Sequence, residues 1–241
     1  MRKRLALLVA VLACIACSVW LALGTVAGTP SGRSVGLFTS LPILWAEAAD
    51  MKGLVDAPDQ PHWARDVLTR RGTLVPLDTL LDLSRIDELV IAQPRPFAPE
   101  ENVALDNWVR NGGRALLFAD PMLTHESAFA LGDRRRPQDV VLISPILSRW
   151  GVQLRYDEGQ PVGPRESAGE RLPINLAGTF SAGPASAEAS CSIAPDGLVA
   201  RCKVGKGRAT LIADAALLES GDEDGRRKAA LTRLLNEAFG D

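Results

Sequence analysis

The sequence is poor in the residues that most metal and thiol chemistry requires. Its 241 residues include only two histidines and four cysteines. No His-x-x-x-His spacing or similar ligand pattern is present to support a metal ion. No cysteine can be matched convincingly with a histidine as a catalytic pair. We therefore expect no metal, no cofactor and no thiol catalysis.

The chain also lacks a strong charge of either sign. Its formal net charge is −2, and leaving out the basic Arg2, Lys3 and Arg4 brings the remainder to −5, because no acidic residue precedes residue 30. A mildly acidic domain without a basic stripe argues against nucleic acid as a partner.

One long hydrophobic run stands at the N-terminus. LALLVAVLACIACSVWLALGTVAG (residues 5–28) follows the basic start and as a helix would reach roughly 35 Å, enough to cross a bilayer. The apolar core of a cleavable signal peptide is only about 7–15 residues long, so the length favours an uncleaved anchor. Thr25-Val26-Ala27 resembles a cleavage site, which keeps a cleaved signal sequence open as an alternative.

This run sets the expected domain organisation and location. Residues 1–29 form a membrane anchor or signal sequence, and residues 30–241 form an exported domain. Basic residues before a span keep the N-terminus in the cytoplasm. We expect a single-pass protein of the inner membrane with a periplasmic C-terminal domain, or a domain secreted to the periplasm after cleavage.

Short apolar runs alternate with helical segments along the exported part. The run at residues 89–92 is continuously apolar, which is typical of a parallel strand covered on both faces. The alternation predicts an α/β fold with a mostly parallel, flavodoxin-like or Rossmann-like sheet, helices on both faces and a C-terminal antiparallel hairpin. Strands are predicted at 34–39, 73–77, 89–92, 115–119, 152–156, 173–176, 189–193, 198–204 and 209–213. Helices are predicted at 43–49, 63–71, from Pro99 to the Gly112-Gly113 stop, at 143–150 and at 224–239, with a loop at 159–170.

Cys191 and Cys202 flank a predicted hairpin whose tip is Asp196-Gly197. Counting outward from this two-residue turn places the two cysteines opposite each other, within disulfide reach. An exported domain permits the bond. We expect a disulfide, and two free buried thiols remain the alternative.

Polar residues follow four of the predicted strands: Ser40, Gln93, Asp120 and Asp214. In a parallel sheet these strand ends share one edge, where ligands bind in open α/β folds. The four residues, joined by His125, are therefore a candidate ligand-binding crevice. For Asp120 the favoured interpretation is a helix N-cap, with Pro121 at the first helical position.

Two further groups have a structural and a functional interpretation. The basic run Arg134-Arg135-Arg136 suits an anion or an acidic partner loop, although such a run is more often a solvated loop. Trp45, Trp63, Trp108 and Trp150 fall on apolar faces and are expected in the core rather than on a stacking surface.

Two segments carry a family resemblance. LVIAQPRPFAPEENVALDNWVRNGGRALLFADP (residues 89–121) resembles the core of class I glutamine amidotransferase-like domains. It is most similar to the non-catalytic type found in auxiliary proteins of gliding-motility-type ABC transporters and related bacterial domains of unknown function. VGKGRATLIADAALLE (residues 204–219) resembles the closing strand of the same domains.

The resemblance also implies that the amidotransferase chemistry is missing. In catalytic members the strand that matches residues 114–119 leads into a turn with a cysteine nucleophile, and the next residue supplies an oxyanion N–H. This chain has Asp120 at that place, and Pro121 has no N–H to donate. We therefore expect a non-enzymatic protein.

Three functions remain open on this basis. The first is a membrane-anchored, non-catalytic accessory subunit of an envelope ABC-type transport or assembly system, with the cytoplasmic membrane and ABC permease and ATPase subunits as partners. The second is a periplasmic protein that binds a small ligand in the strand-end crevice. The third is a hydrolase with a carboxylate site.

Overall fold

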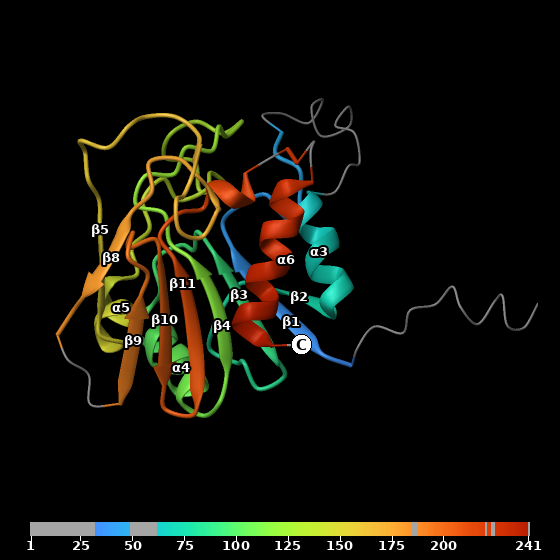
Figure 1. The fold of residues 1–241 in the computed structure, drawn as a ribbon. Helices are drawn as coiled ribbons and strands as arrows, with labels where there is room; N and C mark the ends of the chain where they lie inside the picture. Colours follow the sequence, from blue (N-terminus) through green and yellow to red (C-terminus); the bar gives the residue numbers. More distant parts are fainter. Residues whose placement is uncertain (1–31, 49–61, 185–187, 220, 223–224, 241) are drawn as a thin grey trace, which may run out of the picture. The chain divides into compact units, whose positions relative to one another are not determined.

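Parallel strands form the centre of the fold (Figure 1). The structure is a computed structural model and describes residues 32–48, 62–184, 188–219, 221–222 and 225–240. Its seven-stranded sheet has the order β2-β1-β3-β4-β11-β10-β9, and the first five strands of this order are parallel. Their bounds are β1 Ser34–Thr39, β2 Thr73–Leu77, β3 Glu88–Ala92, β4 Arg114–Phe118 and β11 Gly207–Ile212.

Two antiparallel strands extend this sheet at one edge. β10 (Val199–Val204) pairs with β11, and β9 (Ala189–Ile193) pairs with β10 and closes the edge. Two small sheets lie outside the main one, formed by β5 (Val152–Arg155) with β8 (Thr179–Ala182), and by β6 (Arg165–Glu166) with β7 (Pro173–Ile174).

Helices cover both faces of the parallel strands, which explains the apolar runs within these strands. All five residues of β3 are buried. α3 (Trp63–Arg71) and α6 (Arg226–Phe239) pack together on one face, and α4 (Pro99–Arg110) and α5 (Ser144–Arg149) lie on the other (Figure 1). A short 3-10 helix, η1 (Ala216–Leu218), follows β11. The predicted α/β fold with a mostly parallel sheet is confirmed.

Buried charge, in addition to apolar residues, holds α4 in place. Asp106 is fully buried and its carboxylate accepts hydrogen bonds from Arg110, Arg149 and the indole of Trp150. The bonds from Arg149 and Trp150 join α4 to α5, because Arg149 is the last residue of α5 and Trp150 follows it.

Local predictions failed where tertiary contacts decide the backbone. Residues 43–45 form a turn and a bend and residues 46–48 are irregular, so the helix predicted at 43–49 is wrong over its described part. β8 was not predicted, and the segment at 159–170 contains the short strand β6. Neither strand has an apolar run of its own: β8 forms by pairing with the distant β5, and β6 by pairing with β7 a few residues further on.

The predicted anchor or signal sequence at residues 5–28 lies outside the described residues. Across the part of the chain that the structure describes, no helix combines the length and the apolar character that a membrane crossing requires.

The predicted disulfide is confirmed. Cys191 and Cys202 are directly opposed in the β9–β10 pair, with their Cα atoms 4.0 Å apart, and their sulfur atoms are bonded. The bond fastens the edge strand β9 to β10.

Replacing both cysteines, Cys191→Ala with Cys202→Ala, should lower the free energy of unfolding by about 2–3 kcal/mol, because the bond closes a short loop in the unfolded chain. Urea denaturation measures this change. Wild-type protein treated with a reductant serves as the control and should match the double variant. Alkylation of both thiols in exported protein without prior reduction would contradict the disulfide.

Candidate functional site

Gln93, directly after β3, joins the strand ends at the carboxyl edge of the sheet. Its side-chain amide pairs with Asp120 in both directions: Oε1 accepts the backbone N–H (2.9 Å) and Nε2 donates to the backbone oxygen (3.0 Å). Nε2 also donates to the backbone oxygen of Gln138 at 2.7 Å. The Ser40 hydroxyl donates to the Gln93 carbonyl. Gln93, which is fully buried, therefore connects the ends of β1, β3 and β4 with a distant loop through its backbone carbonyl and its side-chain amide.

Asp120 is fully buried and holds two backbone segments together. Oδ1 accepts the N–H of Met122 at 2.8 Å, and Oδ2 accepts the N–H of Ala215, beyond β11, at 3.1 Å. The predicted helix N-cap is wrong, because no helix begins at Pro121. The residues after Asp120 instead form a loop that comes back to it. At that point the backbone N–H of Val141 donates a hydrogen bond to the Asp120 carbonyl oxygen.

Asp214 lies next to this carboxylate and is also almost completely buried. Its Oδ1 accepts the N–H of Ala216 at 2.5 Å, and its Oδ2 accepts the N–H of Asn175 at 2.9 Å. Burial raises the pKa of Asp120 to about 7, although the two N–H donors act in the opposite direction. Burial, and then the charge of Asp120, raise the pKa of Asp214 well above its usual range.

His125 is placed apart from these four residues, beside Glu47. Its Nε2 lies 3.8 Å from Oε1 of Glu47, and both side chains are about 9% exposed. Within the described residues these two atoms are buried without a hydrogen-bond partner. The other Glu47 oxygen accepts the N–H of Ala128 at 2.8 Å. Glu47 thereby fastens residues 44–48 to the loop after β4.

A second histidine, His62, and a third acidic residue, Glu219, lie near this part of the site. The Thr124 hydroxyl donates to Glu219 Oε1 at 2.6 Å, and the indole of Trp63 donates to the Glu219 backbone oxygen. Burial lowers the pKa of His62, whose Nδ1 accepts the N–H of Ala64. No set of three or more His, Cys, Asp or Glu side chains in the described ranges is arranged to hold a metal ion.

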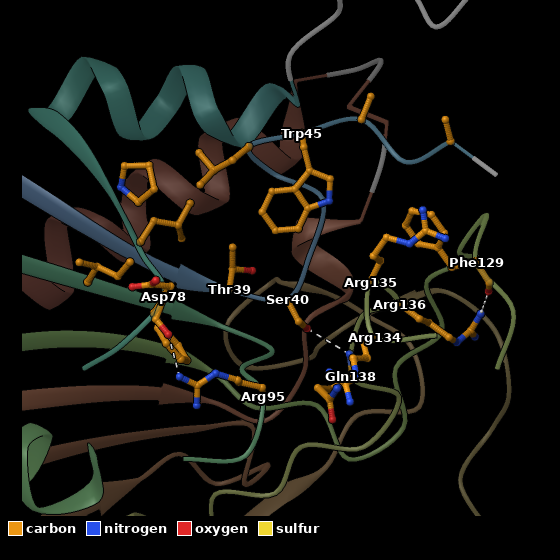
Figure 2. Close-up of a pocket in the computed structure, with 17 residues that line it drawn as sticks. Thr39, Ser40, Trp45, Asp78, Arg95, Phe129, Arg134, Arg135, Arg136 and Gln138 are labelled. Atoms are coloured by element: carbon orange, nitrogen blue, oxygen red, sulfur yellow. Dashed lines mark hydrogen bonds between the residues drawn. The ribbon is translucent and has the colours of Figure 1, made fainter. Parts of the chain in front are cut away.

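The structure thus brings Ser40, Gln93, Asp120 and Asp214 to one edge, as the sequence predicted, but their polar groups are used within the protein. An open pocket lies beside them, at the ends of β1 and β2 (Figure 2). Of the five predicted site residues only Ser40 lines it. Glu47 and Gln138 were not identified from the sequence, since neither lies in a motif and both meet the site through long-range contacts.

The chain is similar to one family over part of its length. A family described as "ABC-type uncharacterized transport system" matches residues 68–160. This match supports the predicted resemblance to ABC-transport auxiliary proteins over the segment from α3 to just beyond β5. No curated protein sequence matches the chain.

Solved structures with a similar arrangement are distant in sequence. An exo-β-1,4-mannosidase from Opitutaceae bacterium strain TAV5 is 15% identical over 87% of this chain and 36% of its own, with a TM-score of 0.47. A GH42 β-galactosidase from G. stearothermophilus is 13% identical over 86% and 30%, with a TM-score of 0.44. A putative ThuA-like protein from Bacteroides uniformis is 13% identical over 88% and 91%, with a TM-score of 0.43. The chain spans about a third of the length of these glycoside hydrolases.

The Gln93 amide can be tested with an isosteric change. Gln93→Glu keeps the size of the side chain but removes the Nε2 donor shared by Asp120 and Gln138. We expect a loss of roughly 1–3 kcal/mol in the free energy of unfolding, because two buried carbonyls lose their donor. Denaturant unfolding checks this, with Gln153→Glu as the control, because the Nε2 of Gln153 donates to no described residue and its acceptor Oε1 is kept. Equal stability of both variants would contradict the role assigned to the amide.

The raised pKa of Asp120 predicts a specific pH dependence. Between about pH 4 and pH 7 the folded protein holds a proton on this carboxyl that the unfolded chain releases, so stability falls as the pH rises. The stability advantage of wild type over Asp120→Asn should therefore shrink by roughly 1–3 kcal/mol from pH 4.5 to pH 7.5.

Urea denaturation across this pH range measures the difference. Asp82→Asn is the matched control: its hydrogen bonds with Ser84 lower the pKa of Asp82, so its effect changes only below this range. A constant difference between wild type and Asp120→Asn would show that the carboxyl titrates normally.

Proposed function

We propose that this protein is a membrane-anchored, non-catalytic accessory subunit of an envelope ABC-type transport system. The observation that carries the proposal is the match of residues 68–160 to the ABC-type transport family. These residues include β3, α4 and β4, the centre of the sheet, and the loop that follows β4.

The chemistry at the strand ends supports a non-catalytic role. Asp120 stands where catalytic relatives of the resembled family carry a cysteine, and its two oxygens accept backbone N–H groups. Cys191 and Cys202, the two cysteines beyond residue 30, are bonded to each other. A hydrolase that uses Asp120 and Asp214 is disfavoured, because a catalytic carboxylate must reach its substrate and these are 0% and 1% exposed.

Two features support the proposed location outside the cytoplasm. The apolar run at residues 5–28 is long enough for an anchor. The Cys191–Cys202 disulfide fits an oxidising compartment such as the periplasm. A domain on that side of the membrane can contact the permease subunits directly, whereas the ATPase subunits associate through them.

The loop after β4 offers the best place to detect such a contact. Eight large hydrophobic side chains of the described residues are exposed, and four of them belong to the segment 122–142: Met122, Leu131, Val140 and Leu142. Exposed apolar side chains concentrated in one segment are typical of a protein-binding surface.

A photo-crosslinking amino acid at Leu131 or Leu142 should therefore capture an ABC permease subunit in intact cells, identified by mass spectrometry. The same amino acid at Thr232, on the exposed side of α6, is the control and should not. The protein should also stay with membranes after an alkaline carbonate wash. Release by the wash, or crosslinks that contain no transporter subunit, would contradict the proposal.

A further inference from the structure

A large open pocket lies where the strand order reverses. The chain runs from β1 outward to β2 and then returns to β3 on the other side of β1. In open parallel sheets the crevice outside the carboxyl ends at such a reversal is where ligands bind. Here it contains a pocket of about 890 Å³, within the size range of small-molecule sites.

The pocket is separate from the buried carboxylates. Asp120 and Asp214 do not line it. The Ser40 hydroxyl faces it but already donates to Gln93 and accepts from the N–H of Gln138. A ligand in this pocket must therefore be recognised by the other residues that line it.

Aromatic and aliphatic side chains form much of the wall. Trp45 was expected in the core, but it is 45% exposed and lines the pocket, together with Leu44, Leu77 and Phe129. The bond from Ala128 N–H to Glu47 fixes the segment of Trp45 against the loop of Phe129. Covering a half-exposed indole with a flat apolar group is favourable, because it removes the apolar surface of both from water.

The charged groups that line the pocket are mostly cationic. Arg95, Arg134, Arg135 and Arg136 face it, and Asp78 is the one acid among the lining residues of the described chain. In Figure 2, Arg95 and Asp78 lie on one side of Trp45, and Arg135 and Arg136 lie with Phe129 on the other.

Three of the four arginines already have a carboxylate partner outside the pocket. Arg95 pairs with Glu101, Arg135 with Asp133 and Arg136 with Asp139. Arg135 also stacks on the Phe129 ring, 4.2 Å from its centre, which stiffens this end of the wall.

Arg134 differs from its neighbours. Its side chain is exposed and has no ion pair or hydrogen bond with any described residue. A guanidinium without a partner, beside an aromatic wall, is suited to bind a carboxylate or phosphate through two parallel hydrogen bonds.

We propose that this pocket binds a small aromatic anion. The ring system lies against the exposed indole of Trp45, and the carboxylate or phosphate pairs with Arg134. The proposal is independent of the accessory role in transport, since the pocket can be occupied whether or not the protein contacts a permease.

The probe for this test is 1-naphthyl phosphate, titrated into the full-length protein by isothermal titration calorimetry. We expect saturable binding at one site. 1-Naphthol supplies the ring without the charge and inorganic phosphate the charge without the ring, so each should bind at least tenfold more weakly. Equal binding of either control compound would overturn the assigned ligand class.

Variants then locate the site. Arg134→Gln and Trp45→Leu should each weaken the binding of 1-naphthyl phosphate by roughly tenfold, as expected for the loss of one good contact. Arg70→Gln removes an exposed arginine on α3 that does not line the pocket and should leave binding unchanged. Both pocket variants alter exposed side chains, so thermal melts should confirm that they fold. No saturable binding by wild type, or wild-type affinity in both pocket variants, would overturn the proposal.

Discussion

The Gln93 side-chain amide is the interaction on which the carboxyl edge of this sheet depends. Parallel strands end with backbone groups that no longer have a neighbour, and here those ends are buried. The amide supplies one acceptor and one donor to Asp120, which continues the β3–β4 pairing by one step beyond the strands. The backbone of Gln93 adopts a left-handed conformation, with φ of 43°, which brings the side chain into this position. This arrangement costs backbone energy that the buried hydrogen bonds offset.

The same edge explains why the buried carboxylates and the open pocket are separated in this protein. Asp120 and Asp214 use their oxygens to hold the loops that follow β4 and β11, so these loops close over the centre of the sheet. The edge is open toward β1 and β2, where the loop of Arg134 and the segment of Trp45 form a pocket. The centre of this edge therefore has a structural carboxylate, and its open surface lies to one side.

Most of the architecture could be predicted because it depends on local composition. The strand at 89–92 and the helix after Pro99 follow from short apolar runs, a favourable first turn and a glycine stop. The site was predicted only in part. Ser40, Gln93, Asp120 and Asp214 do meet at one edge, because parallel strands align their ends. Their burial and the pairing of His125 with Glu47 depend on loops that come from elsewhere in the chain.

The sequence by itself determined the strands of the seven-stranded sheet, most of the helices, and the Cys191–Cys202 pairing, because each follows from periodicity or from counting across a two-residue turn. Tertiary structure decided that Asp120 is a buried bridge and not a helix cap, since its partner Ala215 lies 95 residues away. It also decided which aromatic residue is exposed: Trp150 is fully buried by α4, while Trp45 faces a pocket. Both tryptophans lie in apolar stretches of the sequence, which predicts burial for each of them. Only the packing of distant segments leaves one exposed and buries the other.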